Sequence, residues 1–195
     1  MRLCAVSSFS SLLLLATPPP VSTQTTPPGF TPAANTTLDV YYGAQYISPG
    51  LVVRKSVTQK APIIGLTNST LTGKYILAII DIDGSQNSRP TTVLHALLQD
   101  FTPASTTQNG TSVLTTKATT PSSYFGPAPP AGAPPTHRYV FVLHAQPANF
   151  AVPTAHKQAV SSRFGIEWAR FVEDAGLGVP VAGNWLQVKS GDSSR

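Results

Sequence analysis

The chain has 195 residues, of which 41% are hydrophobic and 11% are charged, and its net charge is +5. This length fits one domain with short tails, and a charged fraction well below the roughly 25% of an average soluble domain is more typical of an extracellular protein than of a cytosolic enzyme. The basic residues are scattered without a Lys or Arg run, which argues against a nucleic-acid-binding surface and leaves a mild attraction for anions.

The N-terminus has the pattern of a secretory signal peptide. Arg2 precedes an uncharged stretch that ends in four leucines, and Val21 and Thr23 occupy the small-residue positions of a cleavage site, so the signal is assigned to residues 1–23. The alternative is a membrane anchor, but the apolar run is short for a spanning helix, and no later stretch is long and apolar enough to be one. We therefore expect a secreted, extracellular protein without a membrane span.

The composition of the expected mature chain supports secretion. The single cysteine, Cys4, lies within the signal, which leaves the mature chain no disulfide, cysteine metal site or cysteine nucleophile. Three N-glycosylation sequons follow, at Asn35, Asn68 and Asn109. Three sequons behind a signal peptide indicate a glycoprotein, provided that the source organism is a eukaryote.

The first half of the mature chain predicts strands. Residues 24–37 are rich in Pro and Thr and are expected to be a poorly ordered linker. Residues 38–47 and 51–57 have strand patterns and are separated by a Ser-Pro-Gly turn. The strongest strand signal covers residues 74–83, where nearly every residue is apolar until Asp81, and this strand should be central and buried on both faces.

The middle of the chain is less uniform. Residues 91–101 fit either a strand or a short helix, and both alternatives remain open from the sequence. Residues 102–123 are polar and low in complexity, as expected of an exposed segment. Residues 138–147 form a second apolar, β-branched run that predicts another core strand, entered from a loop rich in Pro and Gly.

One helix is predicted near the C-terminus, over residues 161–176. Its apolar side chains recur at helical spacing and would form one face: Phe164, Trp168, Phe171, Val172 and Ala175. Ser161 or Ser162 can cap its start and Gly176 can end it. A short final strand follows over 180–188. Many strands followed by one helix exclude the alternation of a parallel α/β sheet and predict a mainly β fold.

Polar residues gather at the ends of the two core strands. Asp81 and Asp83 are two residues apart and should share a face, as should His137 and Tyr139, while Arg138 points the other way. Carboxylates at such positions need partners, and the alternatives are a ligand, a capped loop or an ion pair with an arginine. Two Asp, one His and one Tyr, with His95 as a possible fifth member, could line a small polar pocket that offers donors to an anion and acceptors to an ammonium group.

A metal hydrolase is the competing chemical interpretation of these residues. The sequence contains no H-E-x-x-H or G-x-S-x-G motif and no other metal-ligand spacing, and no serine can be placed in a catalytic triad from the sequence. We therefore expect a protein that is not an enzyme and that needs no cofactor or metal.

The motifs resemble those of the phosphatidylethanolamine-binding protein family. The stretch "PAPPAGAPPTHRYVFVL" is similar to the family's Pro-rich loop and H-R-Y strand, "DIDGSQNSRP" to its D-P-D-x-P segment, and "PVAGNW" to its closing strand. The resemblance covers roughly residues 38–188. Ile82 and Ser85 replace the two prolines of D-P-D-x-P, Ala128 replaces a loop glycine, and one extra residue precedes His137.

The resemblance implies a fold with a large central antiparallel sheet, a smaller second sheet and a C-terminal helix, over residues 38–189, with 190–195 as a polar tail. It also implies an anion-binding cavity at one edge of the sheet. The positions that match this pocket or support it are Asp81, Asp83, His95, Pro129, His137 and Tyr139. Arg138 is expected to pair with Asp83 instead of contacting a ligand.

Two functions follow from the resemblance. The first is a secreted binding protein for phospholipid head groups or other phosphorylated ligands. The alternative is an inhibitor of serine carboxypeptidases or other peptidases, with a peptidase as the partner. In neither case do we expect a nucleic acid partner.

Overall fold

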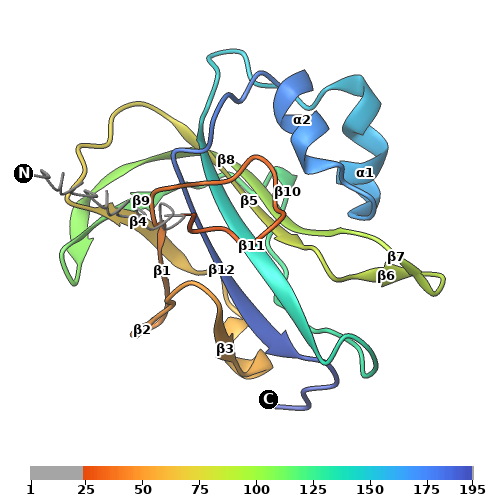
Figure 1. The fold of residues 1–195 in the computed structure, drawn as a ribbon. Coiled ribbons are helices and arrows are strands. Elements are labelled where there is room, and N and C mark those ends of the chain that lie inside the picture. Colours follow the sequence, from red (N-terminus) through yellow and green to blue (C-terminus); the bar gives the residue numbers. More distant parts are fainter. Residues whose placement is uncertain (1–23, 195) are drawn as a thin grey trace, which may run out of the picture.

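The computed structural model describes residues 24–194; the expected signal peptide, residues 1–23, lies outside this range. Within it the chain is mainly β, with four short helical segments (Figure 1). The strands are β1 (Asp39–Tyr42), β2 (Gln45–Tyr46), β3 (Leu51–Val53), β4 (Ile63–Thr67), β5 (Tyr75–Asp81), β6 (Ser85–Gln86), β7 (Arg89–Pro90), β8 (Val93–Gln108), β9 (Thr111–Thr115), β10 (Pro121–Ser122), β11 (Thr136–Ala145) and β12 (Ala182–Lys189). The helical segments are η1 (Lys55–Thr58), η2 (Thr154–His156), α1 (Lys157–Ser162) and α2 (Trp168–Asp174).

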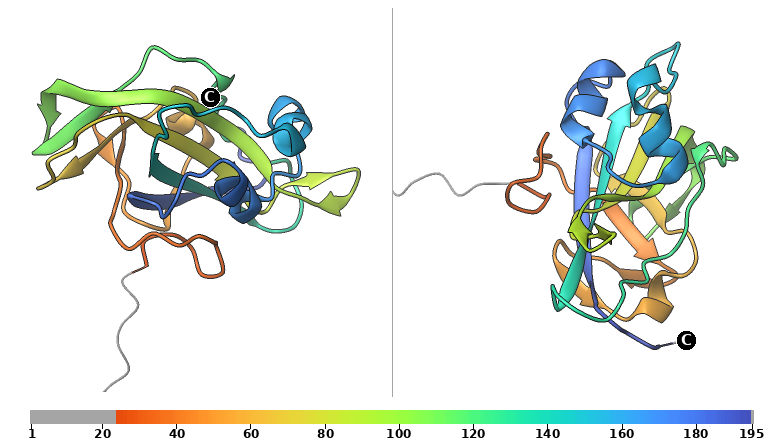
Figure 2. Two further views of the ribbon diagram at one scale, coloured as in Figure 1. Left: turned by 90° about the horizontal axis from the view of Figure 1, so that it is seen from above. Right: turned by 90° about the vertical axis from the view of Figure 1, so that its right-hand side faces the viewer.

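One large curled sheet organises the molecule. Its strand order is β2-β1-β4-β9-β8-β5-β11-β12-β3, with β10 added beside β8, and β6 and β7 form a separate small hairpin. All neighbours in the large sheet are antiparallel except β12 and β3. Helices α1 and α2 lie together at one side of the sheet (Figures 1 and 2). The predicted architecture, with a large central antiparallel sheet, a smaller second sheet and a C-terminal helical part, is confirmed.

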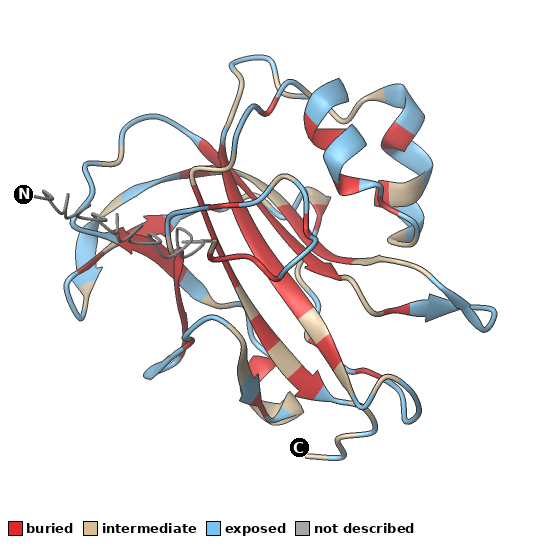
Figure 3. Cartoon of the chain, in the orientation of Figure 1, coloured by how far each residue is buried: buried red, intermediate tan, exposed pale blue. Residues whose placement is uncertain are grey.

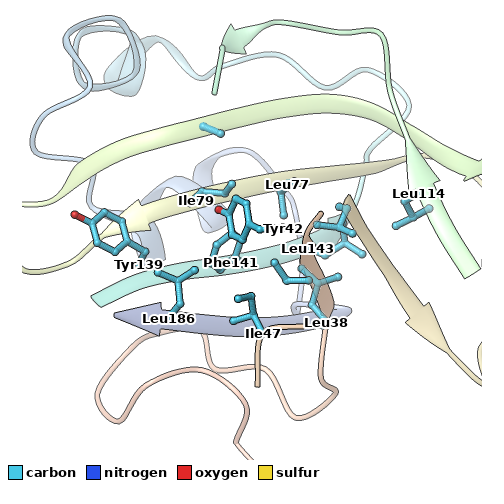
Figure 4. Close-up of a cluster of buried hydrophobic side chains, with 14 of the residues drawn as sticks. Leu38, Tyr42, Ile47, Leu77, Ile79, Leu114, Tyr139, Phe141, Leu143 and Leu186 are labelled. Carbon is cyan, nitrogen blue, oxygen red and sulfur yellow. The ribbon is translucent and has the colours of Figure 1, made fainter. Parts of the chain in front are cut away.

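The central strands are buried on both faces, as their apolar sequences predict. All seven residues of β5 are buried, and β11 is buried over most of its length (Figure 3). On one face Leu77 and Ile79 join the cluster that contains Tyr139 and Phe141 (Figure 4). On the other face the alternate residues of β5 pack against the helices. The consequence is that β5 and β11 form a rigid platform, and the polar residues at their ends are held by it.

The ambiguous segment over 91–101 is a strand. It is the first part of β8, which continues to Gln108 and turns back through Asn109 and Gly110 into β9. Asn109 and Gly110 both have positive φ, of 50° and 85°, which is the backbone of a tight hairpin turn. The polar segment 102–123 is therefore largely exposed, as predicted, but much of it is strand.

The predicted helix over 161–176 is two helices with a break. Arg163 and Gly165 have φ of 70° and 75°, and the backbone between α1 and α2 pairs with the start of β8 through Leu94 N–H to Arg163 O at 2.7 Å. This tertiary pairing overrides a helical apolar pattern. The predicted serine caps are wrong, because Ser161 and Ser162 lie at the end of α1. Gly176 follows α2 with φ of 64°, as predicted for a helix end.

The Pro/Thr-rich segment 24–37 is not a loose linker. Thr25, Thr26 and Ala34 are buried, and the Thr25 N–H donates to Ala34 O at 2.8 Å. The segment then pairs with Gly183 of β12. Tertiary contacts of small side chains thus order a sequence whose composition is typical of disorder.

The polar C-terminal tail is also anchored. The backbone N–H groups of Lys55 and Ser56 donate to the side chains of Asp192 and Ser194, at 2.8 and 3.0 Å. The tail therefore connects the edge of the sheet near β3 to the Pro-rich loop that precedes β11. Within residues 24–194 no helix is long and apolar enough to cross a bilayer.

Candidate functional site

Strands β5 and β11 bring Asp81 and His137 together. Their antiparallel register places Asp81 opposite Tyr139, which makes His137 the diagonal neighbour of Asp81. The Nδ1 atom of His137 lies 2.8 Å from Oδ2 of Asp81, and only 5% of each side chain is exposed. Because a carboxylate accepts, Nδ1 carries the proton, and the Nε2 edge of the ring has no hydrogen-bond partner among residues 24–194.

The second oxygen of Asp81 fixes the turn that follows β5. Oδ1 accepts the backbone N–H of Asp83 at 2.8 Å, so Asp81 also caps this turn. Burial raises the pKa of Asp81, and the hydrogen bond from His137 offsets only part of this rise. Asp81 is therefore a buried acceptor held in place by two donors, and it orients His137.

Tyr139 contributes an unpartnered hydroxyl. The residue is fully buried, and within the described part of the chain its hydroxyl has no hydrogen-bond partner. Figure 4 shows the ring at one end of the apolar cluster, with the hydroxyl directed away from Phe141. Burial, followed by the nearby charge of Asp81, raises the pKa of Tyr139, so the hydroxyl remains protonated and can donate.

His95 completes the group from β8. Its ring lies edge-on to Tyr139 with centroids 5.0 Å apart, while the rings of His137 and Tyr139 are 6.5 Å apart. The Nδ1 atom of His95 lies 2.9 Å from the carbonyl oxygen of Phe125 and donates to it. Burial lowers the pKa of His95 to about 4, so the neutral ring presents Nε2 as an acceptor.

Asp83 does not join this group, although the predicted pair with Arg138 is present. Its carboxylate accepts from Nε and Nη2 of Arg138 at 2.8 and 2.6 Å, and from the Arg138 backbone N–H at 2.9 Å. Although burial acts in the opposite direction, the hydrogen bonds from Arg138 lower the pKa of Asp83. The expectation that Asp81 and Asp83 share a face is wrong, because β5 ends at Asp81 and strand alternation ends with it.

Pro129 lies in the loop before β11 and contacts the C-terminal tail. The residue is buried, and its carbonyl oxygen accepts the N–H of Gly191 at 3.0 Å. The loop is further held by Ser190, whose N–H donates to Pro135 O at 3.0 Å. The tail therefore fixes the loop that leads into His137.

Two residues near the site were missed by sequence reasoning. The Phe125 ring stacks on His95 with centroids 3.9 Å apart, and the Cζ atom of Arg163 lies over the Phe125 ring, 4.9 Å from its centroid. Arg163 also donates to Ser123 O at 2.8 Å. An aromatic residue directly before a Pro-rich loop is a weak sequence signal for Phe125, whereas nothing in the sequence indicates Arg163, which lies at the helix break.

The chemical capacity of the site follows from these roles. Tyr139 offers a donor, His137 offers one through Nε2 when both ring nitrogens carry protons, and Asp81 and His95 offer acceptors, within a nearly closed group of side chains. Residues 24–194 contain no group of three or more His, Cys, Asp or Glu side chains placed to hold a metal ion. The arrangement suits a small ligand that carries both acceptor oxygens and a donor.

Comparison with known sequences identifies a family. The family model described as phosphatidylethanolamine-binding protein matches residues 23–185. Phomoidride biosynthesis cluster protein N of Talaromyces stipitatus is 30% identical over 178 residues, which cover 83% of this chain and 88% of that protein. Protein FLOWERING LOCUS T of Arabidopsis thaliana is 30% identical over 148 residues, 75% of each chain.

Solved structures agree on the fold. A carboxypeptidase Y inhibitor, solved in complex with its cognate proteinase, superposes with a TM-score of 0.62 at 20% identity, over 81% of this chain and 85% of the inhibitor. A phosphatidylethanolamine-binding protein of Plasmodium falciparum gives 0.55 at 15% identity, over 83% and 91% of the two chains. At these identities the likeness concerns the fold alone.

Proposed function

The chain belongs to the phosphatidylethanolamine-binding protein family, and from this premise we propose that it is a secreted, non-enzymatic binding protein for a phospholipid head group or another small phosphorylated ligand. One observation carries the proposal. The bond between Asp81 and His137 fixes the ring so that Nε2 stays free beside the unpartnered hydroxyl of Tyr139. A phosphate oxygen can accept from the Tyr139 hydroxyl, and from Nε2 of His137 when both ring nitrogens carry protons.

The acceptors of the site favour a ligand with a donor as well as a phosphate. Asp81 is held by His137 and the turn after β5, and neutral His95 can accept through Nε2. An ammonium or hydroxyl group next to the phosphate would supply the complementary donor.

Titration calorimetry with phosphoethanolamine, sulfate and inorganic phosphate would test the assignment. Charge-assisted hydrogen bonds contribute roughly 1.5–3 kcal/mol each, so His137→Ala should weaken binding about ten-fold or more. Sulfate carries only acceptor oxygens between pH 7.5 and 5.5, so its binding reports the donors of the site alone. Equal affinities of wild type and His137→Ala would refute the assignment.

Secretion is part of the same proposal. The N-terminal pattern of Arg2 and four leucines supports it, as does the exposure of all three sequon residues, Asn35, Asn68 and Asn109. An extracellular chain without cysteine in its mature part would depend on its packed core for stability, and the two buried clusters of the sheet provide such a core.

A second candidate function is peptidase inhibition. It is favoured by the structural likeness to an inhibitor bound to its proteinase. The nearly closed group around Asp81 and His137 is too small to engage a protease cleft, so inhibition would use the surface of the molecule. A carboxypeptidase Y assay with wild type and His137→Ala distinguishes the two functions, because inhibition should be equal for both proteins.

A further inference from the structure

A cavity lies on the same side of the sheet as the Asp81–His137 site but is separate from it. Its volume is about 450 Å³, and its floor is made by Leu77, Ile79 and Leu114 of strands β5 and β9. These three residues belong to the main buried cluster and are at most 3% exposed. The cavity is therefore a partly open hollow whose floor is the apolar core, and its size falls within the roughly 300–1,000 Å³ of small-molecule sites.

The lid of this cavity is the segment that connects β9 to β10. Ala118 and Thr119 of this segment line the cavity, together with Tyr124, which follows β10. The segment is fixed at both ends: the Thr116 hydroxyl donates to Gln99 O at 2.7 Å, and Pro121 and Ser122 pair with β8. A lid held in this way keeps the cavity formed without a ligand, so binding would require little ordering of the chain.

The lining is mostly apolar and carries no charged side chain. Of the residues that the structure places around the cavity, none is an Asp, Glu, Lys, Arg or His. Burial raises the pKa of Tyr124 to about 12, and its hydroxyl is bonded to Tyr42 and to the carbonyl of Thr58. Only hydroxyl groups remain at the rim, such as those of Thr115 and Thr119. An ionised ligand would lose its hydration here without gaining a partner.

We propose that this cavity binds one uncharged aliphatic or aromatic molecule, whose single hydroxyl or carbonyl group lies at the threonine rim. The apolar part would rest on Leu77, Ile79 and Leu114. The polar end would replace its hydrogen bonds to water by hydrogen bonds to the rim hydroxyls. This site uses none of the residues assigned to the phosphate, and its existence does not depend on the proposed function.

The fluorescent neutral probe N-phenyl-1-naphthylamine tests the proposal directly. The probe should bind wild type with increased emission, and 1-octanol should displace it at a concentration about ten-fold or more below that of octanoate at pH 8, since burial of an unpaired carboxylate is costly. Absence of probe binding, or displacement by octanoate as effective as by octanol, would overturn the proposal.

Variants at the lid locate the bound probe. Ala118→Trp fills the cavity from its mouth and should weaken probe binding about ten-fold or more. Thr119→Phe, at an exposed position of the same lid, should also weaken probe binding. It keeps the test valid if Ala118→Trp fails to fold. Thr106→Trp places an equally large ring at an exposed position of β8 outside the cavity and should leave binding unchanged. Equal affinities of the lid variants and this control would assign the probe to another surface.

Discussion

His137 lies diagonally across from Asp81 on two central antiparallel strands, and its Nδ1 atom is 2.8 Å from the carboxylate, while the next residue, Arg138, binds the other acid, Asp83. Strand alternation thus distributes two adjacent basic residues between two neighbouring acids. Arg138 neutralises Asp83 and closes the turn after β5. His137 is left with a fixed orientation and a free Nε2 edge, which is the property that a binding site requires.

Removal of the Tyr139 hydroxyl should have opposite effects on the stability of the protein and on phosphate binding. A buried donor without a partner costs about 1–3 kcal/mol, so removal of its hydroxyl in Tyr139→Phe should leave the free energy of unfolding unchanged or raise it. If the hydroxyl donates to phosphate, the same change should weaken phosphate binding about ten-fold. Urea unfolding and calorimetry on one preparation would measure both effects.

Tyr75→Phe is the matched control. Tyr75 is also buried, but its hydroxyl donates to Thr72 O at 2.9 Å and accepts the Thr72 N–H at 3.1 Å. Its loss should lower the free energy of unfolding by about 1 kcal/mol and leave phosphate binding intact. A Tyr139→Phe protein that loses stability and retains binding would place the hydroxyl outside the ligand site.

The sequence predicts the platform of the site well. The apolar runs of β5 and β11 identify the two central strands, and alternation within them correctly places His137 and Tyr139 on one face near Asp81. The position of Asp83 could not be predicted in this way, because it lies two residues beyond the last strand residue, where the backbone is free to turn toward Arg138.

Long-range contacts account for the other differences between the structure and the predictions made from the sequence. The contact of Phe125 with His95 joins residues 30 positions apart, and no local pattern encodes it. The helical spacing of Phe164 and Trp168 is real, but the backbone around Arg163 gains hydrogen bonds to β8 that outweigh a continuous helix. The composition of segment 24–37 predicts a poorly ordered linker, but contacts with the sheet that it covers order this segment.

Stability should fall as the pH is lowered from 7 to 5. Burial lowers the pKa of both His95 and His144 to about 4, whereas an unfolded histidine titrates near 6.5. In this window the unfolded state binds more protons than the folded state, so each histidine should remove roughly 2 kcal/mol from the free energy of unfolding at pH 5. Urea unfolding at the two pH values measures the sum.

His144→Phe separates this effect from other titrations. The His144 ring packs edge-on against Trp168, with centroids 5.7 Å apart, and phenylalanine retains that contact. The variant should lose about half of the histidine contribution to the pH dependence. Asp81, whose raised pKa acts in the opposite direction, is common to both proteins and cancels in the comparison. An unchanged pH dependence would contradict burial of a neutral His144.

Expression in eukaryotic cells with the native N-terminus should yield a secreted glycoprotein that begins near Gln24. Asn68 and Asn109 lie at exposed turns with φ of 53° and 50°, and Asn35 is exposed beside the sheet. Each single Asn→Gln change should remove one glycan from the intact mass, and enzymatic deglycosylation should merge the species. A product with the mass of the unmodified 195-residue chain would contradict both secretion and glycosylation.

Gly183 should control the attachment of segment 24–37. A Cβ atom at this position would lie 2.7 Å from Cγ2 of Thr26 and 2.8 Å from Cβ of Ala34, closer than real contacts allow. Gly183→Ala should therefore displace the segment and break the Leu38 N–H to Gly183 O hydrogen bond of 2.9 Å. Hydrogen exchange of the Leu38 amide should accelerate about ten-fold or more, because the segment would open locally without unfolding the domain.

Gly73→Ala provides the comparison for this variant. Gly73 has φ of 86° and open space around the added Cβ, so the change introduces backbone strain of about 1–2 kcal/mol but no collision. It should lower the free energy of unfolding of the domain. The exchange of the Leu38 amide should still occur through the same local opening as in wild type. If both variants accelerate Leu38 equally, the segment is released by general destabilisation, and its close packing over Gly183 is not what holds it to the sheet.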